Sequence, residues 1–244
     1  MSYSLEGEDR IIDSLLRKAN IGTYFDIGCS DPIEISNTYW FYQRGWTGLC
    51  VDGRVDLSQR WRDTRPRDDF RAVLLGEVSG TTNYFNFPDP TLNTCDVIAA
   101  TRYRERFSGV ELLTEQRTVL SGKALWIDWF TQRVSVGGVD EHLTRTVERV
   151  TPPTFVSVDV EGSELSILRG LLSPEFRPPL LVVETKLFNF LRPLEHPVVE
   201  YLVGTHKYCL ISKTPLDAFF IDPWSELFDW IPIEMRNTYE TISR

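Results

Sequence analysis

Hydrophobic residues along the chain form several short, nearly continuous runs that helical patterns or loops separate. Val, Ile, Leu and Phe dominate these runs. Continuous apolar runs of this length are typical of strands covered on both faces, as in a parallel sheet. The pattern predicts strands over 23–28, 47–52, 70–76, 154–160, 179–185, 207–213 and 218–222.

Helical patterns fit between these runs. In 8–19 the apolar residues fall on a single stripe, which predicts an amphipathic helix. A second helix is predicted to run through 39–42, with Ser36 or Asn37 as its cap. A third is predicted over 162–172.

The spacing of the elements predicts the topology. The last two strands are separated only by 214–217, which is too short for a crossover helix, so they must form an antiparallel hairpin. Five parallel strands followed by such a hairpin indicate a doubly wound α/β domain. Between 77 and 150 the rhythm changes, with an added strand at 81–87 and a helix within 124–134. We expect a single domain over 1–244, in which 77–150 is an insertion on the substrate side of the sheet.

Composition narrows the possible partners. The chain has 244 residues, 42% of them hydrophobic and 25% charged, and its formal net charge is -9. Such a chain has material for a core, and its acidity argues against a nucleic-acid partner. Five arginines lie in 60–71, but Asp63, Asp68 and Asp69 interrupt them. We interpret this segment as a solvated helix face and loop rather than a phosphate-binding patch.

The cysteines and the apolar segments indicate the compartment. Cys29, Cys50, Cys95 and Cys209 are scattered without C-x-x-C spacing, which favours a reducing compartment over a disulfide framework or a zinc site. No apolar run approaches the ~18 residues that span a bilayer, and the first residues do not resemble a signal peptide. We expect a cytoplasmic protein with no membrane partner. The hydrophobic segment 224–235 is expected to pack on the domain rather than on a second chain, and the oligomeric state stays open.

A glycine turn follows the first predicted strand. The run Gly28, Cys29, Ser30, Asp31, Pro32 contains one glycine, whereas dinucleotide binders use G-x-G-x-x-G to place a pyrophosphate on a helix N-terminus. Acidic groups repel pyrophosphate but suit a cationic ligand with free ribose hydroxyls, a description that S-adenosylmethionine fits.

Two aspartates strengthen this interpretation. Asp26 lies within the first strand, and Asp52, followed by Gly53, ends the second. A carboxylate at that end can accept hydrogen bonds from both ribose hydroxyls. Asp26 alone could equally be a cap or a strand-end residue. Together with Gly28, the two aspartates predict nucleoside binding.

A second group of acids follows two later strands. Asp159 ends one predicted strand, and Glu184 ends the next. Glu161 and Glu164 open the helix between them, where acidic side chains favour the helix dipole. Asp159 and Glu184 are expected to be neighbours if their strands pair.

Several segments together resemble the FkbM-type S-adenosylmethionine-dependent methyltransferases. The similar segments are YSLEGEDRII at 3–12, the run from YFDIG to GLCVD at 24–52, FPDPTLNT at 87–94 and VSVDVEGSELSILRGL at 156–171. The resemblance implies the class I methyltransferase fold, which is Rossmann-like, with a mostly parallel seven-stranded sheet and an antiparallel last strand. It also implies O-methylation of sugar, polyketide or other natural-product hydroxyls, with S-adenosylmethionine as the cofactor.

The resemblance also implies roles for particular residues. Asp26 and Gly28, with Cys29 and Ser30 in the same turn, would belong to the cofactor loop, and Asp52 with Gly53 to the ribose site. Asn37, Thr38 and Tyr39 match a family S-N-T-Y run that lines the cofactor or closes over it. Asp159, Glu161 and Gly162 match the family D-x-E-G run at the reaction edge. Leu5 stands where the family commonly has Gln, and 121–150 departs from the usual spacing.

Three hypotheses for activating the acceptor hydroxyl remain open. Asp159 could accept its proton or orient it, as its place at a strand end suggests. A Mg²⁺ ion held by Asp159, Glu161 and Glu184 could instead lower the hydroxyl pKa. His142, inside the unusual segment, is an alternative base, whereas His196 and His206 are expected to be structural.

Aromatic residues are candidates for contacting a substrate. Aromatic residues in 39–46 are expected to be mostly core, and Trp126, Trp129 and Phe130 are the better candidates for contacting a substrate.

An NAD-dependent oxidoreductase would share the sheet, but this sequence lacks the glycine triplet expected of one. A catalytically silent nucleoside-binding module would keep the Gly28 turn without chemistry.

Overall fold

The main sheet of the molecule contains seven strands. In the computed structural model, residues 1–106, 113–136 and 150–230 are described. The sheet has the order β3-β2-β1-β7-β8-β10-β9. Its strands are β1 (Thr23–Ile27), β2 (Thr47–Asp52), β3 (Asp69–Ala72), β7 (Phe155–Val158), β8 (Leu180–Glu184), β9 (Cys209–Lys213) and β10 (Asp217–Ile221).

Strand directions confirm the predicted fold class. The five strands from β3 to β8 are parallel to one another, whereas β10 runs antiparallel to both β8 and β9. The tight turn between β9 and β10 is closed by a 2.8 Å hydrogen bond from the Thr214 N–H to the Asp217 carbonyl. This is the predicted doubly wound, Rossmann-like sheet, mostly parallel and with its antiparallel strand in the predicted hairpin.

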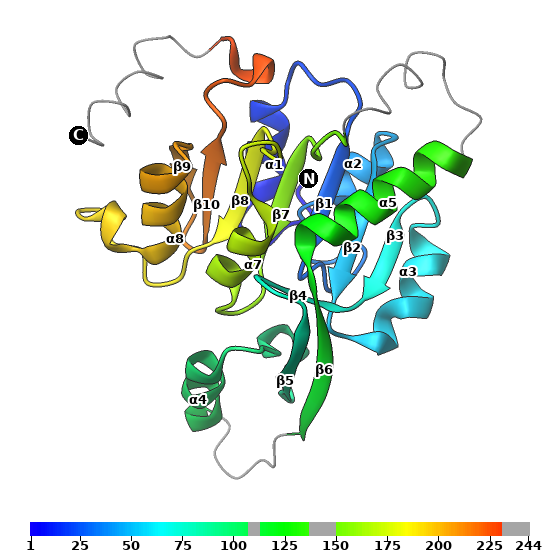
Figure 1. The fold of residues 1–244 in the computed structure, drawn as a ribbon, viewed down its shortest axis with the longest axis vertical. Coiled ribbons are helices and arrows are strands. Elements are labelled where there is room, and N and C mark those ends of the chain that lie inside the picture. Colours follow the sequence, from blue (N-terminus) through cyan, green and yellow to red (C-terminus); the bar gives the residue numbers. More distant parts are fainter. Residues whose placement is uncertain (107–112, 137–149, 231–244) are drawn as a thin grey trace.

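Helices cover both faces of the sheet (Figure 1). On one face lie α1 (Glu8–Leu15), α2 (Tyr39–Gln43) and α3 (Ser58–Thr64), and on the other α5 (Gly122–Val136), α7 (Glu164–Leu171) and α8 (Pro197–Val199). A π-helical turn, Glu200–Thr205, continues α8, and shorter 3-10 turns occupy Val55–Leu57, Pro90–Leu92, Pro193–Glu195 and Glu226–Phe228.

Alternation along the strands builds a separate core on each face. In β1, Phe25 joins the α5 core, whereas Tyr24 joins the core under α1 and α2. Trp126 and Trp129 of α5 are buried in the first core, and Phe130 packs against it. The expectation that Trp126 and Trp129 contact a substrate is therefore wrong, because the sheet covers them; for the half-buried Phe130 it stays a prediction.

A second, smaller sheet corrects one predicted strand. The run 70–76 is not a single strand: a hydrogen bond from the Val73 N–H to the Arg71 carbonyl turns the chain between β3 and β4 (Leu74–Gly76). β4 leaves the main sheet and forms a sheet of order β4-β6-β5 with β5 (Gly80–Asn86) and β6 (Leu113–Ser121). With α4 (Val97–Arg106), these strands form a lobe below the carboxyl ends of the parallel strands (Figure 1). That 77–150 is an insertion within a single domain stays a prediction.

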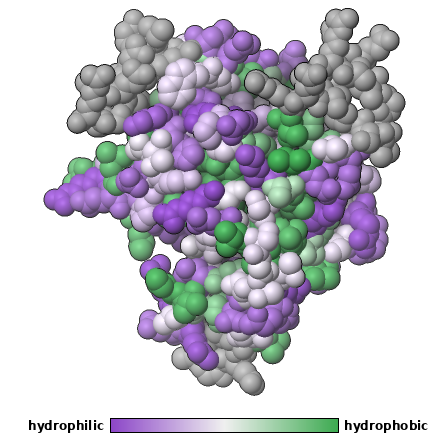
Figure 2. All heavy atoms as spheres, in the orientation of Figure 1, coloured by the Kyte–Doolittle hydropathy of each residue, from purple (hydrophilic) through white to green (hydrophobic). Residues whose placement is uncertain are grey.

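The surface is mixed in polarity, and the C-terminal segment is partly buried. Figure 2 shows polar and hydrophobic side chains interspersed on the α5 face, with a notch between the lobe and the body. Among the described residues, no helix combines the length and apolarity needed to cross a bilayer. Phe228 is fully buried in the α1 core, as expected of a segment that packs on the domain, whereas Trp224 and Trp230 are exposed. Residues 231–235 lie outside the described residues.

Candidate functional site

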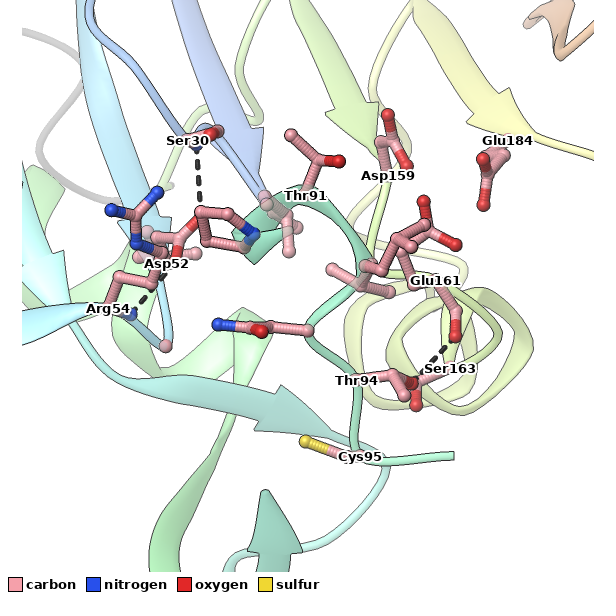
Figure 3. A pocket seen from close by; sticks show the side chains of 18 of the residues that line it. Ser30, Asp52, Arg54, Thr91, Thr94, Cys95, Asp159, Glu161, Ser163 and Glu184 are labelled. Atoms are coloured by element: carbon pink, nitrogen blue, oxygen red, sulfur yellow. Dashed lines mark hydrogen bonds between the residues drawn. The ribbon is translucent and has the colours of Figure 1, made fainter. Parts of the chain in front are cut away.

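A cavity of about 500 Å³ lies where the carboxyl ends of the parallel strands meet the lobe. The main-sheet side of its lining includes Gly28, Ser30, Asp52, Asp159, Glu161 and Glu184, and the lobe contributes residues of 90–95 and Tyr84. Figure 3 shows Asp159, Glu161 and Glu184 gathered on one side of this cavity and Asp52 on the other. Its size is within the range of small-molecule sites.

Gly28 is required by the backbone around the cavity. Its φ is +82°, and a Cβ at this position would overlap the carbonyl oxygen of Asp159. Glycine therefore allows the turn after β1 to cross the end of β7. The turn leads into irregular chain over 29–38 before α2 begins, so no helix N-terminus follows it directly.

Asp52 is held at the cavity wall by the backbone. Its carboxylate accepts hydrogen bonds from the N–H groups of Ser30 at 3.0 Å and Arg54 at 2.8 Å (Figure 3). Burial raises the pKa of Asp52, and these two N–H groups act in the opposite direction. A Cβ on Gly53 would clash with Tyr84, so the Gly53 backbone approaches that ring closely. Each carboxylate oxygen has a lone pair left to accept a ligand hydroxyl.

The other predicted cofactor residues point elsewhere. In the described part of the chain, the residues lining the cavity do not include Asp26, Cys29, Asn37 or Thr38. Asp26 is buried and accepts a 2.6 Å hydrogen bond from the Thr38 hydroxyl, and burial raises its pKa to about 6. Cys29 is buried in the α1 core, and the Asn37 amide donates to the Ser157 hydroxyl at 3.0 Å. These residues support the cavity wall from behind.

Arg65 organises this buried layer and is the exception in 60–71, because the other four arginines of that segment are exposed or half-exposed as expected. Its side chain is 1% exposed and forms a buried ion pair with Asp68 at 2.6 Å. It also donates to the hydroxyls of Tyr24 at 2.8 Å and Thr38 at 3.0 Å, and to the Pro32 carbonyl at 3.2 Å. The guanidinium thus fastens the loop after Gly28 to the sheet.

The predicted acidic group is assembled as expected and contains a lysine that the sequence patterns did not single out. Lys186, just after β8, forms ion pairs with Glu184 at 2.8 Å and with Glu161. Tyr103 of α4 donates its hydroxyl to Glu161 and accepts from Lys186 at 3.1 Å. The position of Lys186, following Glu184 at the end of a core strand, was the available signal.

Asp159 differs from its acidic neighbours in its partners. Within the described residues, no hydrogen bond or ion pair satisfies its carboxylate, although its backbone N–H donates to Ile27. Asp159 is exposed to the cavity. Desolvation by the surrounding protein atoms and then the negative charge of Glu184 raise its pKa above its usual range. Burial and then Glu161 raise the pKa of Glu184 to about 8, while Lys186 opposes that shift. Asp159 is therefore a strong candidate to exchange a proton with a bound molecule.

The remaining predicted residues are structural or outside the described chain. Glu164 accepts hydrogen bonds from the N–H groups of Val160 at 3.2 Å and Gly162 at 2.9 Å, as its place at a helix start suggested. His196 contacts the Lys186 carbonyl at 3.1 Å and does not line the cavity, and His206 packs edge-on against Tyr201. His142 lies outside the described residues.

Comparisons with known proteins identify a similar solved structure and no family. No protein-family model and no curated protein matches the chain. Among solved structures, the chain is similar to a TehB-like SAM-dependent methyltransferase from Corynebacterium glutamicum, with 13% sequence identity and a TM-score of 0.40. The match covers 90% of this chain and 89% of that chain. At this level of similarity the functional argument rests on the residues of the site.

Proposed function

We propose that the protein is an S-adenosylmethionine-dependent O-methyltransferase of the FkbM type. Its substrate would be a hydroxyl of a small molecule, such as a sugar or a polyketide-type natural product. The observation that carries the proposal is Asp52, a half-buried carboxylate at the end of β2 in a class I methyltransferase sheet, oriented by two backbone N–H groups toward the cavity. The acceptor class rests on the sequence resemblance.

The lining of the cavity fits this cofactor. Asp52 can accept the ribose hydroxyls, and Leu74 and Tyr84 nearby offer apolar surface for a base. Asp52 supplies the negative charge of this wall, because the neighbouring Asp31 is already paired with Arg60, and this charge favours a cationic ligand. When bound, S-adenosylmethionine supplies a methyl group on a positively charged sulfur.

The competing oxidoreductase reading fits less well. A dinucleotide would place its pyrophosphate on a glycine-rich turn that opens a helix. Here the turn has one glycine, Gly28, which lets the backbone pass close to the Asp159 carbonyl oxygen. Irregular chain rather than a helix follows it. The aspartates around this turn would repel the pyrophosphate.

The three acidic residues on one side of the cavity would have different roles in the reaction. As the acceptor oxygen attacks, Asp159 would accept the hydroxyl proton, because its carboxylate has no other partner among the described residues and its raised pKa makes it a better base. Glu161 and Glu184 are held by Lys186 and shape the wall beside it. Alignment of the acceptor and exclusion of water would supply the rest of the acceleration.

The magnesium and His142 hypotheses stay predictions. The carboxylates of Asp159, Glu161 and Glu184 lie within 4.8 Å of one another, a spacing that a metal ion could use. Lys186 already places a positive charge on two of them, so the site has less need of a metal. Activity that survives exhaustive chelation would remove the metal from the mechanism.

Calorimetry tests the proposal directly. S-adenosylmethionine and S-adenosylhomocysteine are expected to bind one site, whereas NAD is expected not to bind. NAD binding without S-adenosylmethionine binding would overturn the proposal in favour of the oxidoreductase. A screen of hydroxyl acceptors with a labelled methyl donor then separates an enzyme from a silent module, which would bind the cofactor and label no acceptor.

A further inference from the structure

A second group of carboxylates lies outside the methyl-transfer chemistry. It is formed by Glu6 and Glu8 at the start of the chain and Asp217 at the start of β10. One carboxylate oxygen from each residue lies within 4.8 Å of the other two. The group joins two parts of the molecule that are far apart in the sequence.

Glu8 contains a buried oxygen that no protein group satisfies. Its side chain is 1% exposed, and in the described structure its Oε1 atom is buried without a hydrogen-bond partner. Its other oxygen, Oε2, accepts the Glu6 N–H at 2.9 Å, which fixes the carboxylate in place. Because an unpaired buried carboxylate oxygen is costly, this atom indicates a missing partner.

Protein cations act on the group only from a distance, since Lys213 and Lys186 attract the Asp217 carboxylate without forming an ion pair with it. Within 1–106, 113–136 and 150–230, none of the three carboxylates forms an ion pair with a lysine or arginine. Lys213 lies nearby, but its ammonium donates to the carbonyls of Thr214 at 2.7 Å and Pro215 at 3.2 Å. The Asp159 group, by contrast, has Lys186. The second group therefore brings three carboxylates together without a lysine or arginine paired to any of them in the described residues.

We propose that Glu6, Glu8 and Asp217 bind a divalent cation, and that the cation is Ca²⁺. Carboxylate oxygens are the ligands that hard cations prefer. Three oxygens evenly spaced around one Ca²⁺ ion at about 2.4 Å lie about 4.2 Å apart, so carboxylates within 4.8 Å of one another can converge on one ion with small side-chain movements. Mg²⁺ requires shorter distances and near-octahedral geometry, and the three carboxylates alone suit it less well.

The proposed ion would fasten the start of the chain to the rim of the cavity. Glu6 already accepts the Leu216 N–H at 2.9 Å, and both Leu5 and Leu216 line the cavity. The Tyr3 carbonyl accepts the Ser36 N–H at 3.1 Å from the loop behind the cofactor turn. The ion would thus stabilise one wall of the site without contacting reacting atoms, and the proposal does not depend on which cofactor binds there.

Calorimetry and melting of the chelator-treated full chain test the site with CaCl₂ and MgCl₂ as probes. We expect one Ca²⁺ ion to bind and to raise the melting temperature by about 5–10 °C at a hundredfold excess over Kd. Mg²⁺ should bind more weakly. Absence of binding and of a melting shift at millimolar Ca²⁺ would overturn the proposal, and tighter binding of Mg²⁺ would overturn the assignment to calcium.

Two variants locate the ion. Glu8→Gln and Asp217→Asn should each lower Ca²⁺ affinity at least tenfold, and without Ca²⁺ each should melt at or above the wild-type temperature, because like-charge repulsion is relieved. Glu161→Gln and the exposed Glu77→Gln are the controls and should keep the Ca²⁺ response. A response kept in Glu8→Gln and Asp217→Asn, or lost in Glu161→Gln instead, would overturn the site.

Discussion

Asp26 and Asp52 lie on neighbouring parallel strands, and both follow hydrophobic runs, yet the structure uses them differently. Asp26 pairs in register with Cys50, so Asp52 lies further along its strand, toward the carboxyl edge. At the depth of Asp26 the carboxylate is covered by Thr38 and the Arg65 layer. At the depth of Asp52 it reaches the cavity. Position along the strand decides which acid supports the site and which one faces the ligand.

The largest expected effect comes from the layer that holds Asp26. Arg65→Ala should lower the free energy of unfolding by about 3–5 kcal/mol, because Asp68 would be left buried without its partner. Chemical denaturation measures the loss. Arg62→Ala, on the exposed face of α3 just before Arg65, is the matched control and should lower stability little. Equal losses in the two variants would contradict the assigned role of Arg65.

On the cavity side, Asp159→Asn should lower turnover about 10²- to 10⁴-fold, because the amide cannot accept the hydroxyl proton. Affinity for S-adenosylmethionine should stay close to that of the wild type. Steady-state assays with an acceptor found by the labelled-methyl screen measure the change. Glu34→Gln, at the rim of the same cavity, should keep its turnover. Near-wild-type turnover of Asp159→Asn would remove it as the base.

The buried position of Asp26 predicts a distinct pH dependence. Its pKa is about 6 in the folded protein, above the ordinary value of 3.8, so the folded state binds the proton more tightly than the unfolded state. Its contribution to stability is therefore fully present below about pH 4 and is lost as pH rises through about 6. Relative to Asp26→Asn, the wild type should lose about 2–3 kcal/mol across this window. Denaturation curves that stay parallel from pH 4 to 7 would contradict this account.

Much of the fold was predictable because its signals are local. Continuous apolar runs marked the main strands, and the short turn at 214–217 required a hairpin. The run 70–76 was mistaken for one strand because the turn at Val73 is set by pairing of β4 with β6, which the local pattern does not encode. Tertiary pairing outweighed strand propensity there.

The candidate site was predictable in part for the same reason. Asp52, Asp159 and Glu184 could be placed at the sheet edge, because carboxyl ends of parallel strands meet there. Burial of Arg65 was not predictable, because its partners are brought from distant segments of the chain. The ion pair between Lys186 and Glu161 was not predictable for the same reason, since it depends on how β7 and β8 align.

The most direct measurement compares S-adenosylmethionine binding to Asp52→Asn and Asp26→Asn by titration calorimetry. We expect Asp52→Asn to weaken binding about 10- to 100-fold, because a carboxylate that accepts ribose hydroxyls loses its charge. Asp26→Asn should bind as the wild type does. Equal affinities in the two variants, or a larger loss in Asp26→Asn, would contradict the central claim that Asp52 holds the nucleoside.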